Sequence, residues 1–91
     1  MNSPVEISIE TVDGIADCML DLQEDESGTT FYSVTVLYPN IVNGFSRSEV
    51  YCHNMLCDSA TGKYVFDRND EIHPRVKKLE QQLSAAIGNI S

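Results

Sequence analysis

Apolar and polar residues alternate with a period of two over most of the first half of this chain. In residues 5–12, VEISIETV, the apolar Val5, Ile7 and Ile9 fall on one side, and acidic and hydroxyl side chains fall on the other. This is the pattern of a strand that buries one of its faces. Because such a strand is stable only beside others, the pattern predicts a sheet with one apolar face.

Turn residues divide the chain into further strands. Asp13-Gly14 and Asn43-Gly44 are dipeptides that two-residue hairpin turns prefer, and Gly28 lies in a polar break. Strands are therefore expected over residues 5–12, 15–23, 31–38, 45–56 and 63–67. Pro39 is expected either to end the strand 31–38 or to confine its last residues to a sheet edge.

The period changes in the last part of the chain. From Pro74 onwards, apolar residues recur at spacings of three and four, as in an amphipathic helix. Pro74 suits the first turn, Asp70 and Glu71 suit its N-terminal cap, and Gly88 suits its end. The predicted fold is α+β, a single domain over residues 1–91. It has an antiparallel β-meander of four to five strands and one C-terminal α-helix packed across one face.

The charge is distributed unevenly along the chain. The formal net charge is −8; residues 1–46 contain eight Asp and Glu and no Lys or Arg, whereas residues 47–91 contain six of each sign. An acidic surface repels nucleic-acid backbones and anionic lipid headgroups. We therefore expect no direct binding of nucleic acid or membranes. We expect a protein partner, and a basic one if the acidic half makes the contact.

The sequence favours a cytoplasmic location. No apolar run approaches the roughly 20 residues that cross a bilayer. The opening residues MNSPVEISIE lack a basic segment followed by an apolar one. Three cysteines cannot all pair within one chain, and reduced thiols in a reducing compartment behave as small apolar groups.

The segment EVYCHNMLCD, residues 49–58, places two cysteines and a histidine close together. In a strand, His53 and Cys57 lie about 13 Å apart at roughly 3.3 Å per residue. Two ligands of one zinc ion are only about 4 Å apart. A helix over residues 46–57, for which SRSE offers a capping box, would bring the two side chains together. We expect the strand, and therefore no metal ligands, no catalytic residues and no cofactor.

Two stretches are candidates for contact with another protein. LYPNIVNGF, residues 37–45, mixes large apolar residues with turn residues, and apolar side chains exposed there would form a contact patch. Alternatively, Ile41 and Val42 cap the core. Acidic residues of the first half would attract a basic surface. The candidate contact residues are Tyr38, Ile41, Val42, Phe45, Asp17, Asp21, Glu24, Asp25 and Glu26.

Three functions remain open. The first is a small, acidic, non-enzymatic and adaptor-like protein-interaction domain, which also forms a homodimer through leftover apolar area or an unpaired edge. The second is an acidic inhibitor or nucleic-acid mimic that binds a basic protein surface. The third is a small ligand-binding domain or enzyme with a pocket between sheet and helix, where Tyr32, Tyr38, Tyr51 or His53 supply polar groups.

Overall fold

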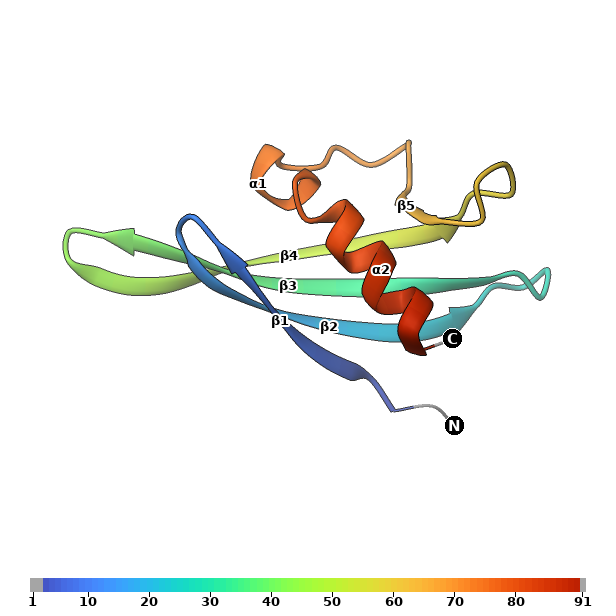
Figure 1. Ribbon diagram of the computed structural model, residues 1–91, viewed down its shortest axis with the longest axis horizontal. Helices are drawn as coiled ribbons and strands as arrows, with labels where there is room; N and C mark the ends of the chain where they lie inside the picture. The colour runs from blue at the N-terminus through green and yellow to red at the C-terminus, as the bar shows by residue number, and fades with distance from the viewer. Residues whose placement is uncertain (1–2, 91) are drawn as a thin grey trace.

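The computed structural model describes residues 3–90, which form one curled antiparallel sheet followed by two helical segments (Figure 1). The strands are β1 Val5–Thr11, β2 Gly14–Glu24, β3 Thr30–Val42, β4 Phe45–Cys57 and β5 Tyr64–Phe66; the helices are α1 Pro74–Lys77 and α2 Glu80–Ile90. Each strand pairs with the next, in the order β1-β2-β3-β4-β5. The predicted α+β class is confirmed, with five strands and a C-terminal helix. The ends of the predicted domain, residues 1–2 and 91, lie outside the described residues.

The alternation in the sequence places the side chains as predicted. In β2, Ala16, Cys18 and Leu20 are buried and the residues between them are exposed. β3 repeats the pattern with Val34 and Val36. Because antiparallel partners share a face, these residues form one continuous apolar side, called here the inner face. The opposite side is the outer face.

The apolar stripe of the C-terminal segment joins the same core. Leu83 and Ile87 are fully buried and belong to one cluster with the inward side chains of the strands. Side chains of α2 also bond the backbone of β5. Ser84 Oγ accepts the Tyr64 amide at 3.0 Å, and Glu80 Oε2 accepts the Phe66 amide at 2.8 Å. In the described part of the chain, no helix is long and apolar enough to span a membrane.

The helix differs from the prediction in its continuity. It is interrupted at Lys78 and Leu79, where the Leu79 amide bonds the Val76 carbonyl in a tighter turn. Gly88 does not end the helix, because its φ angle is not positive and α2 continues to Ile90. A glycine ends a helix by adopting the left-handed conformation, which Gly88 does not adopt.

The predicted N-terminal cap of the helix is also wrong. Asp70 and Glu71 lie upstream, and the N-cap is His73, whose Nδ1 accepts a hydrogen bond from the Arg75 amide at 3.2 Å. A neutral imidazole nitrogen is an acceptor and replaces the carboxylate that was expected in this role. Asp70 instead faces His53, with 3.7 Å between Oδ2 and Nδ1.

Two questions about the strands are also decided. Residues 46–57 belong to β4, so the helical alternative for this segment is wrong. Pro39 does not end its strand; β3 continues to Val42. Beyond Leu37, β3 pairs only with β4. Pro39 therefore lies on a locally free edge, as the second alternative predicted.

We expect Leu83→Ala to reduce the free energy of unfolding by about 2–5 kcal/mol, because it leaves a cavity in a filled core. Leu56→Ala is the matched control. Leu56 lies on the outer face with 38% of its surface exposed, so its loss is expected to cost about 1 kcal/mol or less. Urea unfolding followed by circular dichroism measures both, and equal losses would contradict the assignment of Leu83 to the core.

Candidate interaction surfaces

The β3–β4 hairpin extends beyond the rest of the sheet. The pairing of β2 with β3 ends at Asp17 and Leu37, whereas the pairing of β3 with β4 continues to Val42 and Phe45. Residues 38–49 therefore form a two-stranded projection, called here the arm. The molecule measures 46 × 27 × 23 Å, and the arm lies at one end of the long axis, at the left of Figure 1.

The turn at the end of the arm has the geometry that its dipeptide predicts. Asn43 has φ 52° and Gly44 has φ 77°. Positive φ angles at both central residues are required by the type I′ turn, whose twist matches that of the strands. The turn therefore fixes the register of the arm and places Val42 directly opposite Phe45.

The end of the arm carries large apolar side chains that face solvent. Ile41, Val42 and Phe45 are 68%, 40% and 72% exposed, respectively. Val42 and Phe45 share one face of the arm, and Ile41 lies on the other face opposite Ser46. Ile41 and Val42 therefore do not cap the core, which was the alternative interpretation of this stretch.

Tyr38 differs from the other candidate contact residues of the arm. It is 3% exposed, and its hydroxyl donates to Asp13 Oδ2 at 2.7 Å. The Arg75 guanidinium lies 5.6 Å from the centre of its ring, within the range of a cation–π contact. Tyr38 is therefore buried at the base of the arm and ties it to the β1–β2 turn.

A second group of polar side chains braces the arm between its two strands. Glu49 on β4 accepts a hydrogen bond from Asn40 Nδ2 on β3 at 2.9 Å, and its other oxygen accepts from the Tyr51 hydroxyl. The bond from Tyr51, with smaller contributions from Asn40 and the nearby charge of Arg75, lowers the pKa of Glu49. The same bond raises the pKa of Tyr51. The base of the arm is therefore fixed by hydrogen bonds to a charged carboxylate.

Asn40, Glu49 and Asp13 were not among the predicted contact residues. The contact between Asn40 and Glu49 could have been predicted from the sequence. A two-residue turn at Asn43-Gly44 places both residues on one face of neighbouring strands. The bond from Tyr38 to Asp13 joins residues 25 positions apart and depends on the tertiary fold.

Four carboxylates share the outer face of β1 and β2: Glu6, Glu10, Asp17 and Asp21. This group is called here the acidic outer face. The Ser8 hydroxyl donates to Asp17 Oδ1 at 2.9 Å, and Gln23 Nε2 donates to Asp21 Oδ2 at 2.7 Å. Two of the predicted contact residues, Asp17 and Asp21, are thus brought together with two acidic residues that the prediction did not include.

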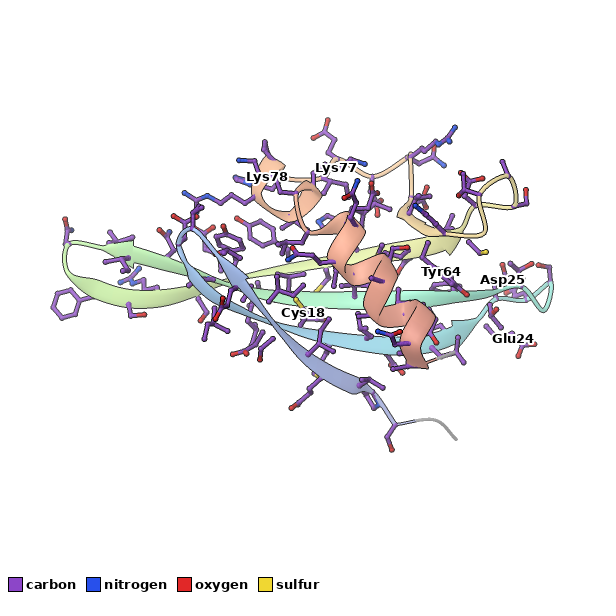
Figure 2. All side chains as sticks on the ribbon, in the orientation of Figure 1. Cys18, Glu24, Asp25, Tyr64, Lys77 and Lys78 are labelled. Carbon is purple, nitrogen blue, oxygen red and sulfur yellow. The ribbon has the colours of Figure 1, made fainter. Side chains whose placement is uncertain are left out.

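The other predicted acidic residues, Glu24, Asp25 and Glu26, lie at the β2–β3 turn. Figure 2 shows Glu24 and Asp25 at the end of the molecule opposite to the arm. Asp25 Oδ1 accepts from the Ser27 hydroxyl at 2.6 Å and from the amides of Ser27 and Thr29, each at 2.9 Å. These bonds, that of the Ser27 hydroxyl first, lower the pKa of Asp25. Asp25 therefore holds the turn together.

The sulfur and imidazole groups do not converge. Cys18 lies in the core, where burial raises its pKa to about 11, while Cys52 and Cys57 are exposed. Figure 2 shows Cys18 near the middle of the molecule. His53 lies edge-on to Phe66, with 5.9 Å between ring centres. Within residues 3–90, no three His, Cys, Asp or Glu side chains are grouped closely enough to hold a metal ion.

A shallow hollow of about 590 Å³ lies between β5 and α2, lined by Tyr64, Glu80 and Ser84 among others. Tyr32, Tyr38, Tyr51 and His53, which were proposed as polar groups of a sheet–helix pocket, do not line it. The hydroxyls of Tyr38 and Tyr51 are already hydrogen-bonded to carboxylates. Tyr38 instead lines a second hollow, of about 380 Å³, with Thr11 of β1 and with Gln82 of the helical segment. One of the four proposed residues therefore does lie at a hollow between sheet and helix.

We expect two of the three thiols to react in the folded protein. Cys52 and Cys57 are exposed, whereas Cys18 is buried and has a raised pKa, and the thiolate is the reactive form. Iodoacetamide labelling at pH 8, followed by mass spectrometry, is expected to modify Cys18 only after unfolding in urea. Modification of Cys18 at the rate of Cys52 would contradict its burial.

We expect Tyr51→Phe to destabilise the protein more at pH 7 than at pH 3. The folded-state pKa of Glu49 lies below its ordinary value of 4.5, so its contribution is present above that pH. The contribution is lost as the pH falls through the lower folded-state pKa. Urea unfolding at both pH values tests this, with Tyr64→Phe as a control that removes a hydroxyl outside the network. Equal losses at the two pH values would show that Glu49 is not involved.

No family model, curated protein or solved structure matches this chain in comparisons of its sequence and fold. The evidence for function therefore comes from the chain's own residues. These residues provide an apolar arm at one end of the molecule, a carboxylate-rich turn at the other end, and an acidic outer face on β1 and β2.

Proposed function

We propose that this chain is a small, acidic and non-enzymatic protein-interaction domain, and that the end of the arm is its contact surface. The observation that carries the proposal is the exposure of Ile41, Val42 and Phe45 on a hairpin that projects from the sheet. Clustered apolar side chains in solvent mark contact sites on soluble proteins. Aromatic side chains such as Phe45 are enriched in protein interfaces.

The bracing at the base of the arm supports the proposal. Glu49 is bonded to Asn40 and Tyr51, and Tyr38 is bonded to Asp13. A contact surface that is already held in place loses less conformational entropy when it binds, so more of the contact energy appears as affinity. The arm therefore presents its apolar end at low entropic cost.

We further propose that α2 has a structural role and packs across the inner face of the sheet. In support, Leu83 and Ile87 are fully buried in one cluster with Val34 and Met55. With the inner face closed in this way, the arm and the outer face are the surfaces left for partners.

The proposed partner is another protein, and we include a second copy of this chain. Packing of two arms against each other would bury Phe45 and Val42, which are otherwise exposed. We place the domain in the cytoplasm. Cys52 and Cys57 are both exposed and unpaired, which suits a reducing compartment.

The alternative function, an acidic inhibitor or nucleic-acid mimic, is supported by a different observation. Glu6, Glu10, Asp17 and Asp21 share one exposed side of β1 and β2, and the first half of the chain carries no cation. Such a surface would bind a basic groove through long-range attraction, which salt screens. Binding through the arm depends on apolar burial and is less sensitive to salt.

We expect Ile41→Ser combined with Phe45→Ser to abolish capture of the protein partner from a cytosolic extract, and to leave the fold unchanged. Val12→Ser is the matched control, because Val12 is 98% exposed but lies outside the arm. Capture by the wild type is expected to persist at 500 mM salt. If capture disappears at 500 mM salt and the arm variant binds normally, the acidic surface makes the contact and the proposed role of the arm fails.

Self-association is tested on the purified protein. Light scattering at high micromolar concentration is expected to give a dimer for the wild type and a monomer for Phe45→Ser. A wild-type monomer at that concentration would remove the homodimer from the proposal, and the capture experiment would still decide the role of the arm.

A further inference from the structure

The two edges of the sheet are treated differently. At one edge, β5 has only three residues and pairs with β4 only at Met55, Leu56 and Cys57; two of its amides are bonded by the side chains of Ser84 and Glu80. In residues 3–90, the rest of β4 has no strand on that side. At the other edge, β1 pairs only with β2. Among the described residues, no further backbone bond reaches β1. Because alternate peptide groups of an edge strand point away from its neighbour, β1 presents unpaired donors and acceptors.

The strand β1 lacks most of the features that protect an edge. It has seven residues in regular alternation, Val5–Thr11, and contains neither proline nor lysine. Its inner-face residues Val5 and Ile7 are only half-buried, whereas Ala16 and Cys18 on the next strand are buried. A strand added to this edge would complete the burial of Val5 and Ile7.

The charges on β1 indicate which strand would fit. Glu6 and Glu10 lie on the outer face of the edge, and both are exposed. Asp17 and Asp21 beside them accept hydrogen bonds from Ser8 and Gln23, whereas no hydrogen bond within residues 3–90 reaches the carboxylates of Glu6 and Glu10. These two charges are therefore available to a partner at the edge.

In the two registers that pair β1 along its full length, a second copy of β1 does not suit this edge. In an antiparallel pair centred on Ser8, Glu6 of one copy would face Glu10 of the other. In a parallel pair in register, each glutamate would face itself. Like charges directly opposite each other destabilise a strand pair. The same two glutamates attract a strand that carries cations at the matching positions.

We propose that the free edge of β1 binds an extended segment of a partner protein as a sixth strand. The outer face of this added strand carries Lys or Arg at two positions four residues apart, and its inner face carries apolar residues. Side chains directly opposite in neighbouring strands lie about 4.5–5.5 Å apart, so the two cations would meet Glu6 and Glu10. The apolar residues would cover Val5 and Ile7, as in other cases of β-strand addition.

The charges near the end of β1 favour a segment with one cationic face and one apolar face over a uniformly basic segment. A hollow beside the end of β1 is lined by Glu10 and Thr11 from the strand, by Tyr38 from β3, and by Arg75, Lys78 and Gln82 among others from the helical segment. Arg75 and Lys78 bring two positive charges to this hollow beside Glu10, so further cations of an added strand close to the helical segment would be repelled. The pattern of the segment is therefore cationic on one face and apolar on the other.

The test uses a fluorescent peptide of sequence TKVTVKT with blocked ends, added to the full chain at 50 mM salt. Fluorescence anisotropy is expected to show saturable binding, and the charge-inverted peptide TEVTVET is expected not to bind. Two further TKVTVKT peptides carry N-methyl groups on alternate residues, in the two possible phases. Only the phase whose amides face β1 is expected to lose binding, because N-methylation removes the donors that pair with the strand.

The matching protein variant is Glu6→Lys combined with Glu10→Lys. It is expected to bind TKVTVKT at least about tenfold more weakly, since two attractive pairs become repulsive, and to gain binding of TEVTVET. Glu26→Lys combined with Glu71→Lys is the control, because it makes the same change in net charge at exposed positions away from β1. This control is expected to keep at least half of the wild-type affinity at 50 mM salt.

The outcomes that overturn the proposal are distinct. If TKVTVKT does not bind saturably, Glu6 and Glu10 only protect the edge against self-pairing. If both N-methylated peptides bind like the parent, the contact is made by charge alone and β1 receives no strand. Phe45→Ser is expected to leave peptide binding unchanged. Loss of binding in that variant would place the peptide on the arm, so failure of the edge and failure of the proposed function are distinguishable.

Discussion

The fold depends on the burial of one apolar cluster shared by the strands and the C-terminal helix. A single sheet with one apolar face is not stable in water, and Leu83 and Ile87 join Val34 and Met55 in that cluster. Two hydrogen bonds from β5 amides to side chains of α2 hold β5, the shortest strand, beside that helix. The end of the arm and the outer face remain exposed, and the edge of β1 remains unpaired within residues 3–90.

Much of this fold follows from local sequence patterns. A period of two separates the inner from the outer face, and the Asn43-Gly44 turn fixes the register of the arm. The length of the arm was not predictable in this way. It depends on where β2 stops pairing with β3, at Asp17 and Leu37, and no local pattern marks that point. The strand simply continues through Pro39, because only its free side lacks a bonding partner there.

The site was less predictable than the fold, because side chains can be used for structure or for contact without a change in the local pattern. Tyr38 and Phe45 are both aromatic residues near one turn, but Tyr38 is buried with its hydroxyl on Asp13, and Phe45 is exposed. Asp25 and Glu26 are neighbouring acidic residues, but three hydrogen bonds to Asp25 hold the turn. Only the tertiary contacts distinguish these roles.

The acidic first half illustrates the same division of roles. Eight carboxylates without a cation repel one another, and donors within the fold offset part of this repulsion at Asp13, Asp17 and Asp25. Glu6 and Glu10 receive no such donor within residues 3–90 and lie on the strand whose outer edge is unpaired. The edge of β1 combines unpaired backbone groups with two carboxylates that accept no hydrogen bond within residues 3–90, and so combines directional hydrogen bonding with salt-dependent attraction. The strands of the arm also have free sides, but the contact proposed at its end is made by apolar side chains. The two proposed contacts are therefore separable by ionic strength, because salt would weaken binding at the edge and would leave apolar burial at the arm nearly unchanged.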